Sequence, residues 1–77
     1  MYRPKKFSDI AKPFSELSYR EQQVITLLSG GLSNKEIAGK LGVTEGTVKI
    51  HLHRIYGKLG VRSRSELISA LAARLVF

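Results

Sequence analysis

Hydrophobic residues recur every three or four positions through most of the chain, the spacing of an amphipathic α-helix rather than of a strand. This pattern predicts four helices, over residues 16–29, 34–41, 45–59 and 64–75. Their apolar positions are Leu17, Val24, Leu27 and Leu28, then Ile37, Ala38 and Leu41, then Val48, Leu52, Ile55 and Leu59, and finally Leu67, Ile68, Leu71 and Leu75. Because only a few residues separate consecutive helices, neighbouring helices should pack directly on each other. We therefore expect an all-α, four-helix domain.

Local signals at the helix ends support this division. The S-x-x-E pattern of a capping box, in which serine and glutamate side chains each accept a backbone N–H at a helix start, occurs at residues 18–21, 33–36 and 63–66. Thr44 is a further N-cap candidate, just before the third helix. Glycines at the helix ends suit the left-handed backbone of a C-cap; they are Gly30, Gly31, Gly42 and Gly60.

Length and composition narrow the class of protein. A chain of 77 residues has room for one small domain. It has no Cys, which excludes a disulfide scaffold and a thiolate metal site, and its two His lack a neighbouring carboxylate cluster, so no metal or other cofactor is expected. The residue sets of the common active sites are missing, which predicts no enzyme. Without an apolar stretch near the roughly 20 residues of a membrane span, we expect a cytoplasmic protein with no membrane partner.

The charge of the chain points to a polyanionic partner. Thirteen Lys and Arg against six Asp and Glu give a net charge of +7, which favours nucleic acid. Residues 1–14 combine two prolines with four basic residues, which predicts a basic linker or flexible arm ahead of a domain spanning 15–77. Within that domain, the stretch 47–64 holds no acidic residue and seven basic or imidazole side chains: Lys49, His51, His53, Arg54, Lys58, Arg62 and Arg64.

The predicted third helix separates apolar from basic side chains. On a helical wheel Leu52, Ile55 and Leu59 lie within roughly 40° of Val48 and form an inward stripe. The opposite side carries Lys49 at its margin and then Gly46, Ile50, His53, Arg54 and Gly57. Lys donates to guanine acceptors, His donates or accepts at a base edge, and Ile contacts a thymine methyl, so this face suits a DNA groove.

The preceding segment supplies the geometry for that role. A short helix ends in Leu41-Gly42, a tight turn follows, and the basic helix then begins. Ala38 stands where the two helices must cross closely, and a Cβ at Gly42 would resist the turn. This arrangement predicts a helix-turn-helix that binds double-stranded DNA.

The segment Leu17 to Leu75 resembles the DNA-binding domain of the LuxR/FixJ/NarL family of bacterial transcriptional regulators. The resemblance rests on residues at the family's characteristic spacings: Leu17-Ser18, Arg20-Glu21, Val24, Leu27, Gly31, Asn34-Lys35-Glu36-Ile37-Ala38, Leu41, Val43, Thr47-Val48-Lys49, His51, Ile55, Lys58-Leu59 and Arg62-Ser63. It implies a four-helix domain whose third helix enters the major groove and whose fourth contributes to dimer contacts. Full-length members usually carry an N-terminal receiver or ligand-binding domain, so both a response-regulator output domain and a stand-alone regulator remain open.

Roles follow from the wheel and from the resemblance. We expect base contacts from Lys49, Ile50 and His53, and backbone contacts from Ser33, Asn34, Lys35, Thr44, Thr47, His51, Arg54, Lys58, Arg62 and Ser63. The Ser and Thr residues among them are also needed as local caps, and His51 could instead pack half-buried beside the core stripe. Arg20 is expected to pair with an acidic side chain inside the domain rather than to bind DNA.

The last helix has more apolar residues than one core face requires, namely Ala70, Ala73 and Val76. We expect this surface to pair two subunits as a homodimer on an inverted repeat, although alanine is also simply a good helix former. RNA polymerase is a further candidate partner. The alternatives are a sigma-factor region-four-like domain, which uses similar helices on promoters, and a protein–protein adaptor, whose binding would depend little on salt.

Overall fold

The structure is a computed structural model that describes residues 16–75. Within this range the chain forms helices α2 (Tyr19–Ser29), α3 (Asn34–Leu41), α4 (Glu45–Leu59) and α5 (Arg64–Leu75), and no strand. The predicted all-α class is therefore confirmed, and the last three helices have the predicted bounds. The expected arm at 1–14 and the dimer candidate Val76 lie outside the described residues.

The first helix begins later than the apolar spacing predicted. We expected it over 16–29, but Ser18 is the N-cap, with an extended backbone at φ −67° and ψ 163°. Ser18 Oγ accepts from the Glu21 N–H at 3.1 Å, and the Glu21 carboxylate accepts from the Ser18 N–H at 2.8 Å. Leu17 is buried, but it packs on the core from just outside the helix, as apolar residues before a cap often do. The apolar pattern therefore extends one position beyond the N-cap, two positions before the first residue of the helix.

The other helix starts follow the predicted caps with one difference. Ser33 and Glu36 form a complete capping box, and Thr44 Oγ1 accepts from the Thr47 N–H at 3.1 Å. At the third predicted box, Ser63 Oγ accepts from the Glu66 N–H at 3.2 Å, but the Glu66 carboxylate accepts from the Arg62 N–H rather than from Ser63. This box is only half formed, because Glu66 reaches one residue further back along the chain.

The turn between α3 and α4 has the predicted geometry. Gly42 adopts a left-handed backbone with φ 68°, and its N–H donates to the Ala38 carbonyl, as does the N–H of Val43. A Cβ at Gly42 would meet nothing within 4 Å, so the requirement for glycine comes from the backbone conformation and not from lack of space. Ala38 is 5% exposed, consistent with a close crossing of α3 and α4.

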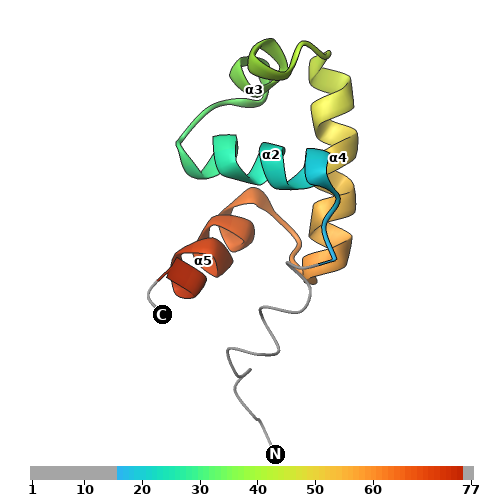
Figure 1. Cartoon of the computed structure of the whole chain (residues 1–77). Helices are drawn as coiled ribbons and strands as arrows, with labels where there is room; N and C mark the ends of the chain where they lie inside the picture. Colours follow the sequence, from blue (N-terminus) through green and yellow to red (C-terminus); the bar gives the residue numbers. More distant parts are fainter. Residues whose placement is uncertain (1–15, 76–77) are drawn as a thin grey trace, which may run out of the picture.

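The helices enclose one small core (Figure 1). α4 runs along one side of the molecule, α2 crosses it, α3 packs beside the N-terminal end of α4, and α5 lies on the far side of α2 from α3. Every helix contributes to the core, which consists of Leu17, Val24, Leu28, Ile37, Ala38, Val48, Leu52, Ile55, Leu59, Leu67 and Leu71. Burial of side chains of this size contributes roughly 1.5–3 kcal/mol each, before entropic costs.

One predicted core residue is exposed. Ile68 was expected on the buried stripe of the last helix, but it is 47% exposed. The core face of α5 is instead carried by Leu67 and Leu71, which lie one turn apart. Ile68 stands about 100° around the helix from Leu67, which brings it to the edge of the interface. The side chain of Leu75 is outside the described set.

Candidate nucleic-acid interface

α4 has one buried face and one exposed face, as the helical wheel predicted. Val48 and Ile55 are fully buried, and Leu52 and Leu59 are buried beside them. On the other side Ile50 is 55% exposed. The buried stripe fixes the rotation of α4, and the opposite side chains must therefore face outward.

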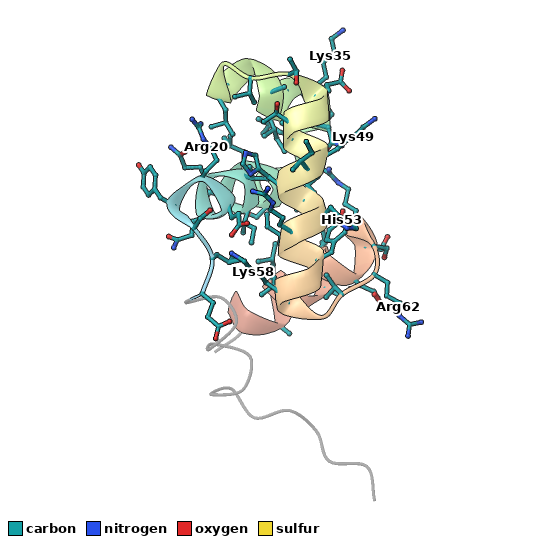
Figure 2. The ribbon with its side chains drawn as sticks, turned by 90° about the vertical axis from the view of Figure 1, so that its right-hand side faces the viewer. Arg20, Lys35, Lys49, His53, Lys58 and Arg62 are labelled. Carbon is teal, nitrogen blue, oxygen red and sulfur yellow. The ribbon has the colours of Figure 1, made fainter. Side chains whose placement is uncertain are left out.

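Basic and imidazole side chains surround the exposed Ile50. Lys49, His53 and Arg54 are all exposed, and none has a hydrogen-bond or ion-pair partner among the described residues. Figure 2 shows Lys49 and His53 on the same side of α4, with Lys35 beyond its N-terminal end and Arg62 beyond its C-terminal end. The structure thus brings predicted base contacts and predicted backbone contacts to one face.

Lys58, a predicted backbone contact, differs from these side chains. Its ammonium lies 2.7 Å from Glu21 Oε1 and also donates to the Glu16 carbonyl at 3.3 Å. The Lys58 side chain is 37% exposed, whereas that of Glu21 is only 3% exposed. Lys58 therefore joins the C-terminal part of α4 to the start of α2, on the side of α4 away from Lys49 (Figure 2).

The Glu21 carboxyl is charged in a buried position because several donors surround it. Burial raises its pKa, but the hydrogen bond from Lys58, the Ser18 N–H and the charge of Lys58 together bring the pKa below the usual 4.5. Sequence reasoning missed this pair. A signal was present, because Glu21 stands three and seven residues before the core residues Val24 and Leu28, on the same helix face.

The predicted internal partner of Arg20 is not found. Arg20 is exposed, and Lys58–Glu21 is the only ion pair among residues 16–75. Glu21, which follows Arg20 directly in α2, is already bound by Lys58. Consecutive residues in a helix point about 100° apart, so Glu21 faces the core while Arg20 faces solvent.

The Ser and Thr side chains predicted to contact the DNA backbone all lie in helix N-caps or hydrogen-bond to a capping residue. Ser33, Thr44 and Ser63 each accept a backbone N–H, and Thr47 Oγ1 lies 3.0 Å from Thr44 Oγ1. Thr44 and Ser33 nevertheless remain exposed at the N-termini of α4 and α3. Their capping role is established by the geometry. It leaves the Ser33 proton available as a donor to a phosphate oxygen, whereas Thr44 and Thr47 share one hydroxyl–hydroxyl hydrogen bond, so only one of these two protons is available.

His51 is half-buried on α4. Its burial agrees with the predicted alternative in which it packs beside the core stripe. Its Nδ1 atom is buried and has no hydrogen-bond partner among the described residues. The ring can therefore reach a partner outside the domain only through its other nitrogen, Nε2.

Arg64 makes contacts that sequence reasoning did not find. Its guanidinium donates through one nitrogen to Asn34 Oδ1 at 2.9 Å and through the other to the Leu32 carbonyl. The bond to Asn34 joins the first residue of α5 to the first residue of α3, across 30 positions of sequence. No local pattern specifies such a contact, because it depends on how the helices pack.

The predicted pairing surface on α5 is partly described. Ala73 is exposed, and Ala70 is half-buried. Next to them the exposed Ile68 borders a shallow, mainly apolar pocket of about 250 Å³ between α5 and the end of α2, lined by Leu28, Ser29, Gly31, Ile68, Leu71 and Ala72. Other classes of site are not evident in the described part of the chain: residues 16–75 contain no cluster of three metal-ligating side chains, and none of their helices is long and apolar enough to cross a membrane.

Comparison with known proteins identifies the family. Residues 15–71 match the family described as "Bacterial regulatory proteins, luxR family". The chain is 48% identical over 64 residues to the transcriptional regulatory protein LnrK of Bacillus subtilis, an alignment that covers 80% of this chain and 29% of LnrK. It is 52% identical over 52 residues to the nitrate/nitrite response regulator protein NarP of Escherichia coli, covering 68% of this chain and 24% of NarP. The chain thus spans less than a third of each of these relatives.

Solved structures agree with the sequence comparison. The response regulator StyR superposes with a TM-score of 0.79 at 47% identity, over 86% of this chain and 33% of StyR. Full-length FixJ from B. japonicum superposes with a TM-score of 0.80 at 32% identity, over 92% of this chain and 35% of FixJ. These relatives are regulators and not enzymes, and the match favours the regulator family over the sigma-factor and adaptor alternatives. The chain belongs to the luxR family of bacterial regulatory proteins and carries the family's helix-turn-helix domain, which binds DNA in the regulation of transcription.

Proposed function

We propose that this domain recognises a specific double-stranded DNA sequence by placing α4 in the major groove. The observation that carries the proposal is the outward face of α4, where Lys49, Ile50 and His53 are exposed while the opposite face is locked into the core. A groove-reading helix needs side chains that are free of internal partners and held by a rigid backbone. Lys49 and His53 would bond to base edges, and Ile50 would contact a thymine methyl.

Backbone contacts would surround this reading face and set its register. The proposed groups come from the starts of α3 and α4, from the outer side of α4 and from the loop that follows: Ser33, Asn34, Lys35, Thr44, Thr47, His51, Arg54, Lys58, Arg62 and Ser63. For His51 the contact would be made through Nε2, since Nδ1 is buried. For Lys58 the role is limited, because two of its three ammonium protons already have acceptors.

We further propose that two copies bind an inverted repeat, with α5 as the pairing helix. The exposed Ala73, together with Ala70, would allow close approach of a second helix, and the exposed Ile68 would supply apolar area beside them. Two recognition helices would then enter successive major grooves on one side of the duplex. The whole regulator would be the DNA-binding output of a bacterial response regulator acting in the cytoplasm, with RNA polymerase as a second partner.

Selection of random duplex DNA by the chain, followed by sequencing, tests this function. We expect enrichment of an inverted repeat, and binding whose log–log salt slope is near −0.9 for each phosphate neutralised. Enrichment of a single half-site would remove the pairing proposal alone. Binding that is salt-sensitive but shows no sequence preference would contradict recognition by α4.

A further inference from the structure

We infer that Arg64 is a positioning residue for DNA binding, which it serves by orienting the carboxamide of Asn34. The inference rests on the proposed function, in which Arg64 has no role of its own. Arg64 differs from the other basic residues near that face because both ends of its guanidinium are bonded inside the domain.

The geometry leaves little freedom to the Asn34 side chain. The Arg64 guanidinium donates to Asn34 Oδ1 at 2.9 Å, so the oxygen of the carboxamide is the acceptor and its NH₂ group is turned away from Arg64. Guanidinium has no acceptor atom, so the opposite orientation would place two donors against each other and is disfavoured. The half-buried Asn34 therefore presents a donor, and not an acceptor, on its remaining side.

The position of this donor matches the needs of a phosphate contact. Asn34 is the first residue of α3, where the free backbone N–H groups and the helix dipole already favour an anion. The carbonyl of Leu32, in the preceding loop, also accepts from Arg64. Arg64 thus engages two acceptors at this end of α3 and leaves donors facing outward.

The same bonds connect two functional parts of the domain. They join the start of α5, the proposed pairing helix, to the start of α3, which holds α4 through the helix-turn-helix. Lys at position 64 would keep the charge but has no planar fork with which to hold two acceptors at once. Substitution by Lys therefore tests the two hydrogen bonds of Arg64 separately from its charge.

The first test substitutes Asn34 and measures DNA binding and thermal unfolding on the selected operator. Asn34→Asp retains the acceptor for Arg64 and should keep the unfolding midpoint at or above that of the unmodified chain, but it replaces the outward donor by a carboxylate. We expect at least a tenfold loss of affinity. Gly39→Asp is the matched control: it adds the same charge to α3 at an exposed position where a Cβ meets nothing within 4 Å, and it should change affinity less than twofold. Equal losses from the two Asp variants would overturn the inference.

The second test asks whether Arg64 acts through Asn34. Arg64→Lys should lower affinity roughly three- to tenfold with an unchanged salt slope, and it should have no further effect in an Asn34→Ala background. A direct phosphate contact by Arg64 would instead give losses that multiply in the double variant, and that result would overturn the positioning role. If the unmodified chain bound no duplex at all, the proposed function itself would fail, which is distinguishable from either outcome.

Discussion

Four of the five cationic and imidazole side chains of α4, all except the half-buried His51, occupy two different environments. Toward its N-terminal end and middle, Lys49, His53 and Arg54 are exposed and have no partner among the described residues. Near its C-terminal end, Lys58 is bound to the buried Glu21 and to a backbone carbonyl of the segment before α2. The helix therefore combines a region available to a ligand with a region that fixes its own position. Net charge alone would have assigned all four side chains to the same role.

The largest effect is expected from a charge placed on the buried face of α4, which holds both regions in position. Val48→Asp places a carboxylate at a fully buried position on α4, directly before the exposed Lys49. A core of this size supplies only about 3–5 kcal/mol of stability, and burying an unpaired charge costs at least as much. We expect no cooperative thermal unfolding transition by circular dichroism. Lys49→Asp, one position along and exposed, should remain folded, and a folded Val48→Asp variant would contradict the assignment of the core face.

The second prediction compares how much a lysine from each region contributes to the free energy of unfolding. Lys58→Met keeps the apolar stem but leaves Glu21 buried without its cation, which should cost roughly 1–3 kcal/mol. This is less than for a fully buried pair, because Lys58 is 37% exposed and partly screened by solvent. Lys49→Met should change the free energy of unfolding by no more than about 0.5 kcal/mol. Urea unfolding of both variants is the measurement, and equal losses would show that the two ends of α4 do not differ.

A double variant checks that the loss comes from this pair. Glu21→Gln removes the charge that Lys58→Met strands, so the two changes together should cost less than the sum of the single costs. Strict additivity would mean that Lys58 stabilises the domain through contacts other than Glu21.

The third prediction separates the same regions by DNA recognition. His53→Ala or Ile50→Ala should reduce the preference for the operator over random duplex by roughly 1–3 kcal/mol for each lost base contact. Because both side chains are exposed, stability should change by no more than about 0.5 kcal/mol. Competition binding against random duplex measures the preference. If neither variant changed the preferred sequence or its margin, the assignment of α4 as the reading helix would be wrong.

The differences between prediction and structure have a common physical origin. The three helices predicted over 34–41, 45–59 and 64–75 were found with those bounds because caps, glycines and apolar spacing are local signals. The contacts of Lys58 and Arg64 join residues 37 and 30 positions apart, and they depend on how α2 crosses α4 and where α5 starts beside α3. A wheel shows which way a side chain points, but not what another helix brings to it. The charged Glu21 on an otherwise apolar face was the one local sign that a partner was required.

The smallest predicted effect is the response of the anchored region to acid. The pKa of Glu21 in the folded domain lies below its usual value of 4.5, since hydrogen bonds and the Lys58 charge outweigh the effect of burial. A carboxyl with a lowered folded-state pKa contributes stability that is fully present above its unfolded-state pKa and is lost as the pH falls through the folded-state value. Stability should therefore hold at neutral pH and decline below about pH 4.5. Glu36, whose pKa is lowered by the Ser33 N–H and hydroxyl, changes in the same direction.

The matching experiment compares unfolding midpoints from pH 7 to pH 3 for the unmodified chain and for Glu21→Gln. The variant should lose less stability on acidification, but not none, because the Glu36 capping box still titrates in it. Identical acid dependence in the two proteins would mean that the Lys58–Glu21 pair stabilises the charged carboxylate no better in the folded domain than water does in the unfolded chain. In that case α4 would be held by its apolar stripe alone, and the difference between its two ends would lie in exposure and not in electrostatics.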